Sequence, residues 1–135
     1  MTISPSRVPV HRILLAEDDD SMRAFLERAL ARAGYDVIGF ANGVEALETL
    51  NRMHSAGQLP ALILTDINMP EMDGITFITR VKEGPFRFVP VLVLTTEGEK
   101  ASIERGRMAG ASGWLLKPFQ PEQLLWAIKK LVWPT

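Results

Sequence analysis

The sequence contains no cysteine, which excludes a disulfide framework and any metal site built on thiolates. It also has no basic surplus: 15 Lys and Arg stand against 16 Asp and Glu, and a net charge of −1 argues against a nucleic-acid partner. Its apolar runs are only a few residues long, whereas a membrane span needs about 20 residues. We therefore expect a cytoplasmic protein that neither inserts into a membrane nor binds nucleic acid.

The length of 135 residues is sufficient for one domain with its own core. Residues 1–10 include Pro5 and Pro9 but no apolar stretch of the kind found in signal peptides. We predict a disordered lead over residues 1–10 and one folded domain over residues 11–135, with no output domain attached after the last helix.

Short apolar runs alternate five times with segments in which apolar residues recur at three-and-four spacing. Runs that are apolar throughout are typical of parallel strands buried on both faces, and right-handed crossovers place helices on both sides of such a sheet. The sequence therefore predicts a doubly wound α/β sandwich. Strands are expected at residues 13–16, 35–40, 62–65, 91–94 and 115–116, and the last helix is expected to begin at Pro121.

The segment 97–110 has the weakest helix pattern, because Gly98 and Gly106 lower its helix propensity. Only three of its apolar residues are candidates for burial: Ile103, Met108 and Ala109. We expect this helix to be the most mobile of the five.

Polar side chains stand at the ends of four predicted strands: Glu17-Asp18, Asp66, Thr95-Thr96 and Lys117. Each has an ordinary explanation by itself, since a strand-terminal Asp often caps a helix and a strand-terminal Thr often satisfies a loop amide. Together they favour a site, because the carboxyl ends of parallel strands meet at one edge of the sheet, where ligands bind. Carboxylates held there repel one another unless a hard cation such as Mg²⁺ binds between them, and that cation can hold an anionic ligand.

With these residues the sequence resembles the receiver domain of two-component response regulators, most closely the CheY-like chemotaxis type, over about residues 11–133. The matching segments are Glu17-Asp18, residues 65–74, Thr95 and residues 117–119, and segments 94–97 and 109–114 match the chemotaxis type. The resemblance implies a flavodoxin-like (βα)5 sandwich with a five-stranded parallel sheet in the order 2-1-3-4-5. It also implies a cis peptide bond between Lys117 and Pro118.

The resemblance implies that Asp66 is the phosphoacceptor, which takes a phosphoryl group from a sensor histidine kinase. Thr95 would donate a hydroxyl hydrogen bond to the phosphoryl oxygens, and Lys117 would pair with them as a compact charge. These three residues are the expected catalytic residues. The chain is not expected to be a turnover enzyme, because it would catalyse only its own phosphorylation and dephosphorylation.

Mg²⁺ is the expected cofactor. The resemblance implies that Asp18 and Asp66 bind the ion directly, that Glu17 acts through water, and that the backbone carbonyl of Asn68 supplies a further oxygen. The metal would neutralise the anionic oxygens that an attacking carboxylate meets.

Other polar residues near these positions are expected to have structural roles. Asp19 or Asp20 is predicted to cap the first helix, with Ser21 as a rival for the cap, and Asp73-Gly74 is interpreted as a turn that begins the third helix.

Phosphorylation is expected to switch the surface formed by residues 97–110, the last strand and the last helix. Thr95 would move toward the phosphate, and Trp114 would move into the space that it leaves. Trp126 and Trp133 either pack at the sheet edge and the chain end or form an exposed patch near this surface. The expected partner is an output protein such as the flagellar switch, in chemotaxis or motility signalling, or a second copy in a phosphorylation-dependent homodimer.

Two other functions are consistent with parts of the pattern. A phosphorelay shuttle would pass the phosphoryl group on to a histidine phosphotransfer protein. A haloacid-dehalogenase-like phosphatase also uses Asp, Mg²⁺, Thr and Lys, but it needs a second acid two residues after the nucleophile, where this sequence has Asn68. Nucleotide binding is disfavoured, because neither G-x-G-x-x-G nor G-x-x-x-x-G-K-[ST] occurs.

Overall fold

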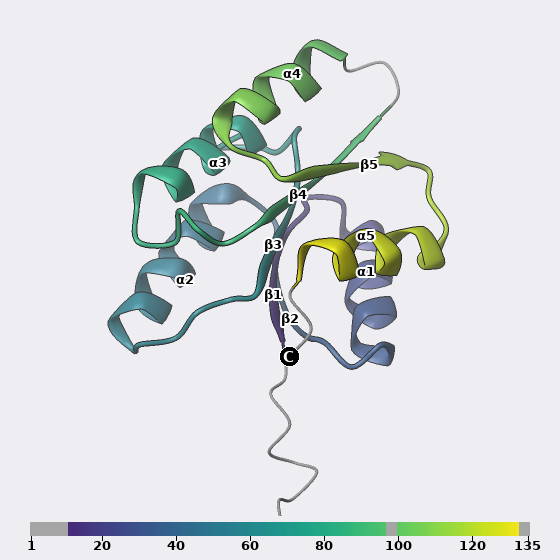
Figure 1. The fold of residues 1–135 in the computed structure, drawn as a ribbon, viewed down its shortest axis with the longest axis horizontal. Coiled ribbons are helices and arrows are strands. Elements are labelled where there is room, and N and C mark those ends of the chain that lie inside the picture. Colours follow the sequence, from purple (N-terminus) through teal and green to yellow (C-terminus); the bar gives the residue numbers. More distant parts are fainter. Residues whose placement is uncertain (1–10, 97–99, 133–135) are drawn as a thin grey trace, which may run out of the picture.

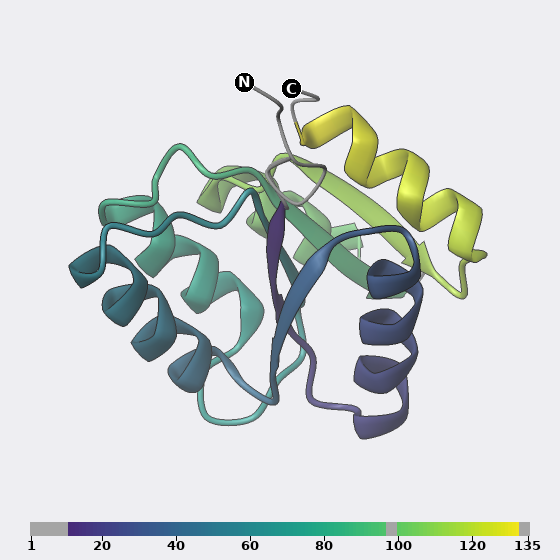
Figure 2. The same cartoon turned by 90° about the horizontal axis from the view of Figure 1, so that it is seen from below.

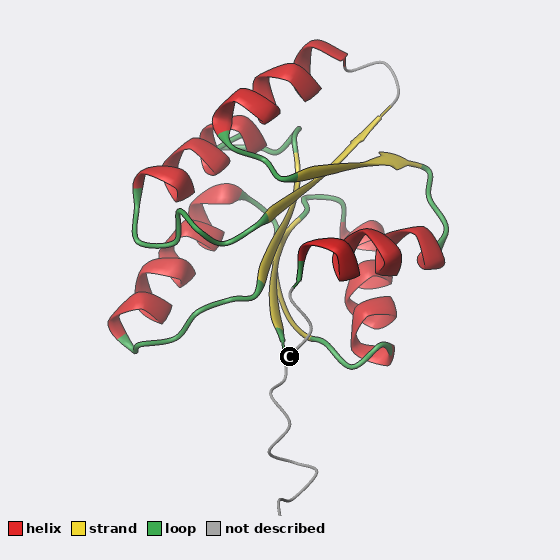
Figure 3. Cartoon of the chain, viewed as in Figure 1, coloured by secondary structure: helices red, strands yellow, loops and turns green. Residues whose placement is uncertain are grey.

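The structure is a computed structural model that describes residues 11–96 and 100–132. The lead predicted for residues 1–10, together with Gly98 and Trp133, lies outside the described residues. In the described part, strands and helices alternate along the chain (Figures 1 and 3). The strands are β1 (Arg12–Ala16), β2 (Asp36–Phe40), β3 (Leu62–Asp66), β4 (Val91–Thr96) and β5 (Gly113–Lys117). The helices are α1 (Asp20–Arg32), α2 (Gly43–Ser55), α3 (Gly74–Glu83), α4 (Lys100–Ala109) and α5 (Pro121–Leu131).

The five strands form one parallel sheet in the order β2-β1-β3-β4-β5, which confirms the predicted topology. Helices α1 and α5 cover one face, and α2, α3 and α4 cover the other (Figures 1 and 2). The lysine–proline peptide after β5 is cis, as expected. No helix in the described ranges is long and apolar enough to cross a membrane.

The core is divided into two layers by the sheet, because successive side chains of a strand point to opposite faces. Leu14 and Ile63 belong to the layer beneath α2 and α3, which also contains the fully buried Phe77. Ile13 and Leu64 belong to the layer beneath α1 and α5. Burial on both faces explains why the central strands are apolar throughout.

Side chains cap the start of α1, α2 and α3, and the caps of α1 and α3 lie near polar strand ends. Of the three rival caps for α1, Asp19 is the one used, since its carboxylate accepts a hydrogen bond from the Met22 N–H at 2.8 Å. Asp73 caps α3 in the same way, accepting from the Thr76 N–H at 2.8 Å. Both caps place a helix N-terminus close to a strand end at the carboxyl edge of the sheet.

Met108, one of the three candidates for burial in this helix, is 80% exposed, so that expectation was wrong for Met108. The buried residue of α4 is Gly106, where an added Cβ would lie 3.5 Å from Ile75 Cδ1 and 3.6 Å from Trp114 Nε1. A helix turns about 100° per residue, so Met108, two positions further on, points away from this contact. The apolar pattern misplaced the buried face because a glycine makes the contact.

Candidate functional site

Three carboxylates converge at the carboxyl edge of the sheet. Strands β1 and β3 are parallel neighbours that pair Ala16 with Thr65, so the residues that follow them meet at the same edge. Ligand oxygens of Glu17, Asp18 and Asp66 lie within 4.8 Å of one another. Glu17 is fully buried and Asp66 is 8% exposed, whereas Asp18 faces solvent. The arrangement can hold a hard cation between two fixed carboxylates and one that opens to water.

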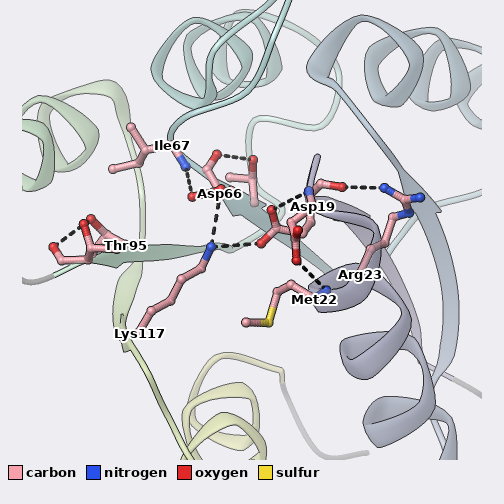
Figure 4. Close-up of polar contacts among 10 residues, drawn as sticks. Asp19, Met22, Arg23, Asp66, Ile67, Thr95 and Lys117 are labelled. Atoms are coloured by element: carbon pink, nitrogen blue, oxygen red, sulfur yellow. Dashed lines mark hydrogen bonds and ion pairs between the residues drawn. The ribbon is translucent and has the colours of Figure 1, made fainter.

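The ammonium group of Lys117 lies beside this cluster of carboxylates. Lys117 ends β5, and its side chain reaches past β4 so that Nζ lies 3.0 Å from Glu17 Oε1 and 3.4 Å from Asp66 Oδ2 (Figure 4). One ammonium group therefore faces two buried carboxylates. The sequence reasoning placed Lys117 against phosphoryl oxygens and did not anticipate that it also bridges these two acids.

The Asp66 carboxylate is held in one orientation. Its Oδ1 accepts a hydrogen bond from the Ile67 N–H at 2.8 Å, while Oδ2 faces Lys117 (Figure 4). The preceding Thr65 hydroxyl donates to the Asp66 carbonyl at 2.9 Å. Asn68, the remaining expected metal ligand, is exposed in the loop two residues after Asp66.

Thr95 lies at the end of β4, beside the acidic cluster. It is 1% exposed and is the residue after Leu94, which pairs with Asp66 across the two strands. Its hydroxyl donates to the Thr96 carbonyl at 3.4 Å. The three residues expected to handle the phosphoryl group therefore come from the carboxyl ends of three consecutive strands of the sheet (Figure 4).

Trp114 lies on β5, opposite Val93 of β4, and packs against the core layer beneath α3 and α4. Its indole N–H is buried and has no hydrogen-bond partner among residues 11–96 and 100–132. A buried donor left unpaired costs about 1–3 kcal/mol, so the present position of the indole is held at an energetic cost.

Gly74 is a site residue that the sequence reasoning treated only as part of a turn. Its N–H donates to the Ile67 carbonyl at 2.7 Å. A Cβ added there would lie 2.2 Å from the Asp66 carbonyl oxygen and 2.7 Å from Ile67 Cα. The first residue of α3 thus rests on the backbone that carries Asp66, and the Asp73-Gly74 pair was the only sequence signal of this approach.

Burial, reinforced by the negative charge of Asp66, raises the pKa of Glu17 to about 7 even though Lys117 opposes the shift. Burial alone lowers the pKa of Lys117. The hydrogen bond to Glu17 and the charge of Asp66 outweigh that effect, so the pKa of Lys117 is raised. The site without a metal ion is therefore short of positive charge, which is the electrostatic condition that favours a divalent cation.

The raised pKa of Glu17 predicts how stability depends on pH in the absence of metal. Between pH 4.5, its ordinary pKa, and about 7, the folded protein holds a proton that the unfolded chain releases. The free energy of unfolding should therefore fall as the pH rises through this window, with a slope of at most about 1.4 kcal/mol per pH unit from this group. Urea unfolding in a chelator should show this slope in wild type and lose it in Glu17→Gln. Parallel curves for the two proteins would contradict the assignment.

A cavity of about 490 Å³ lies at the opposite, amino-terminal edge of the sheet, beside Pro60, Phe86 and Pro90. These residues precede β3 and β4, whereas the acidic cluster follows β1 and β3. The cavity is therefore not part of the candidate site, which is an open rim formed by strand ends.

Comparison with known proteins shows which family has this fold and this group of strand-end residues. A family model described as response regulator receiver domain matches residues 13–129. The chemotaxis protein CheY1 of Helicobacter pylori is 36% identical over 115 residues, which cover 84% of this chain and 90% of that protein. The solved structure of chemotaxis protein CheY4 of Vibrio cholerae has a TM-score of 0.83 and 34% identity, covering 92% of this chain and 100% of that one.

A second similar structure bears on the metal. It is the receiver domain of the sensor histidine kinase PA1611 of Pseudomonas aeruginosa PAO1, solved with a magnesium ion coordinated in the active site cleft. It has a TM-score of 0.81 and 27% identity, and the match covers 91% of this chain and 98% of that one.

Proposed function

The chain belongs to the response regulator receiver domain family, and from this membership we propose that it accepts a phosphoryl group on Asp66 in a Mg²⁺-dependent reaction. The observation that carries the proposal is the convergence of Glu17, Asp18 and Asp66, with Lys117 bridging two of them. The similar proteins are signalling regulators, and this chain is proposed to act as one and to have no turnover activity. We assign the receiver domain to residues 11–135 and expect a cytoplasmic location.

The donor set suits Mg²⁺, because carboxylate and carbonyl oxygens are its preferred ligands and several waters complete its shell. We propose that Asp18 and Asp66 bind the ion directly, that Glu17 acts through water, and that the Asn68 carbonyl contributes. When bound, the ion supplies the positive charge that lets a carboxylate approach anionic phosphoryl oxygens. The magnesium in the PA1611 receiver domain supports this choice of metal.

The chemistry proposed for the protein side chains is a transfer between two groups. A carboxylate oxygen of Asp66 forms a bond to phosphorus as the bond between phosphorus and a histidine nitrogen of the kinase breaks, which gives an acyl phosphate. Lys117 Nζ, now 3.4 Å from Asp66 Oδ2, is placed to hold a phosphoryl oxygen. Thr95 donates its hydroxyl to another. Lys117 and Thr95 are therefore already placed to stabilise the new charge of roughly −1.5 to −2.

The proposed readout is a change in the surface formed by α4, β5 and α5. Thr95 moves toward the phosphate and Trp114 moves into the space released. This frees the indole from a position in which its N–H has no partner in the described part of the chain. The surface exposes apolar side chains that a partner can cover: Met108 is 80%, Leu116 48% and Trp126 63% exposed. Lys130 Nζ lies 3.7 Å from the Trp126 ring centroid and adds a positive charge to the patch.

The proposed partners follow from this surface and from the chemotaxis relatives. A sensor histidine kinase supplies the phosphoryl group, and an output protein such as the flagellar switch, or a second copy of the chain, binds the switched surface. The alternative role is a phosphorelay shuttle. A shuttle would return its phosphate rapidly to a histidine phosphotransfer protein, whereas a motility regulator would bind its output target only when phosphorylated.

The experiment that tests the proposed function is intact-mass measurement after incubation with acetyl phosphate. The wild-type protein should gain the mass of one phosphoryl group with Mg²⁺ and gain none in excess chelator. Equal labelling in both conditions would contradict the metal requirement. Steady multiple turnover of small phosphomonoesters would instead favour the haloacid-dehalogenase-like alternative.

The coupling through Trp114 gives a separate prediction. With Mg²⁺ and a phosphate mimic such as beryllofluoride, the tryptophan fluorescence of wild type should change, because the half-buried indole leaves its present surroundings. Trp114→Phe retains Trp126 and Trp133 and should lose most of the change. An identical change in wild type and Trp114→Phe would show that Trp114 does not report the switch.

A further inference from the structure

We propose that Arg23 is a positioning residue for the metal site: its guanidinium fixes the backbone that carries Glu17 and Asp18 and thereby sets the affinity for Mg²⁺. The inference rests on the proposed function only for the identity of the ion. Arg23 lies on α1, outside the carboxylate cluster. Within the described part of the chain its guanidinium bonds to Glu17 and Asp20 and to neither Asp66 nor Lys117.

The two terminal nitrogens of Arg23 bind different residues. Nη1 donates to the Glu17 carbonyl oxygen at 2.8 Å (Figure 4). Nη2 donates to Asp20 Oδ1 at 2.6 Å. The arginine side chain is 21% exposed, whereas that of Asp20 is 88% exposed. An ion pair so open to water contributes little to stability, so the bond to the partly buried carbonyl is the significant one.

The Glu17 carbonyl stands where the backbone leaves the sheet. The Glu17 N–H still donates to the Phe40 carbonyl of β2 at 2.9 Å, which continues the ladder of β1. The Asp19 N–H turns back and donates to Glu17 Oε2 at 3.2 Å. Between these two bonds lies the Glu17–Asp18 peptide, whose carbonyl is held by Arg23. Rotation of that peptide would redirect the Asp18 side chain, and the arginine bond opposes it.

Gly39 of β2 leaves room for the arginine to reach this carbonyl. A Cβ added at Gly39 would lie 3.3 Å from Arg23 Cδ and 2.9 Å from Glu27 Oε2. A side chain at position 39 would therefore press on the stem of Arg23 and on the Glu27 carboxylate, and a branched one would force them aside. Gly39 and Arg23 therefore act together: because Gly39 has no side chain, Arg23 can extend from α1 across β2 to the Glu17 carbonyl.

Arg23 acts through the backbone, since its described bonds go to a carbonyl and to the exposed Asp20 and not to the oxygens that face the metal. Groups that orient metal ligands in this way typically change metal affinity by 10- to 100-fold when they are removed. The loss should appear in the binding of Mg²⁺ and not in the rate of phosphoryl acceptance once the metal is saturating. A variant that loses Mg²⁺ affinity but keeps this rate has lost the positioning of the metal ligands, whereas a variant with a damaged fold would lose both.

Calorimetric titration of Mg²⁺ into the full chain tests the proposal. Arg23→Ala should bind Mg²⁺ about tenfold more weakly than wild type. Arg23→Lys, which keeps one cationic donor, should fall between them, and Asp20→Asn, which removes only the exposed ion pair, should match wild type. Gly39→Val should reproduce the loss by displacing Arg23. At saturating Mg²⁺, phosphoryl acceptance by Arg23→Ala should return to the wild-type rate.

An Arg23→Ala protein that folds and binds Mg²⁺ with wild-type affinity would overturn the proposal, as would an equal loss in Asp20→Asn. If Arg23→Ala does not fold, the Arg23→Lys and Gly39→Val titrations decide, and wild-type affinity in both would overturn it. If the Arg23 variants lose Mg²⁺ affinity while wild type accepts no phosphoryl group, the role of Arg23 stands and the proposed function fails.

Discussion

Replacement of Asp66 by Asn is expected to reduce phosphoryl acceptance below detection. A neutral amide lacks the nucleophilic oxygen that forms an acyl phosphate, and the change also removes one of the three carboxylates that face the metal. The fold should survive, because the Asn side-chain oxygen can still accept the hydrogen bond from the Ile67 N–H. Without metal the variant should be at least as stable as wild type, since Glu17 no longer faces a second buried negative charge.

The matched control for this prediction is Asp73→Asn. Asp73 is an exposed aspartate seven positions along the chain, and Asn is as good a helix N-cap, so α3 should keep its start. Intact-mass measurement with acetyl phosphate and Mg²⁺ should show one phosphoryl group on wild type and on Asp73→Asn, and none on Asp66→Asn. Undiminished labelling of Asp66→Asn would place the phosphoacceptor elsewhere.

Gly74→Ala is expected to damage both the fold and the site. Its new methyl group would lie 2.2 Å from the Asp66 carbonyl oxygen and 2.7 Å from Ile67 Cα, so the obstruction is backbone and cannot rotate away. Either α3 must move outward or the Asp66–Ile67 segment must shift. Overpacking of this kind costs about 1–3 kcal/mol, and displacement of Asp66 should also slow phosphoryl acceptance.

Gly84→Ala, at the other end of α3, provides the comparison. An added Cβ there would lie 3.7 Å from the nearest backbone oxygen, that of Arg80, which is an ordinary contact. Urea unfolding and the rate of labelling by acetyl phosphate should both be close to wild type for Gly84→Ala and clearly reduced for Gly74→Ala. Equal behaviour of the two variants would show that the close approach at Gly74 does not constrain the site.

Much of the fold could be predicted because its elements follow simple periodicities. All five strands were predicted near their observed positions, and the parallel sheet follows from runs such as Leu62–Asp66 that are buried on both faces. The order of the strands came from the family resemblance and is confirmed. The meeting of Glu17, Asp18 and Asp66 followed from a topological rule, since parallel neighbours end at the same edge.

Other features could not be predicted because they depend on distances between elements. The pattern of α4 does not show that Gly106 is the contact and Met108 the outward residue. The bridge from Lys117 to Glu17 joins residues 100 positions apart, and its length depends on the twist and spacing of three strands. The backbone approach at Gly74 likewise leaves no signal in a hydrophobic pattern, because glycine has no side chain to contribute to one.

Chemical localisation of the phosphoryl group on the wild-type protein tests the central claim most directly. Borohydride reduces an acyl phosphate on aspartate to the alcohol, homoserine, which peptide mass spectrometry assigns to one position. After incubation with acetyl phosphate and Mg²⁺, homoserine should appear at position 66 and should be absent when a chelator replaces the metal. A reduced residue at Asp18 or Asp19, or a phosphoryl group found on His11 or His54, would contradict the assignment of Asp66 as the acceptor.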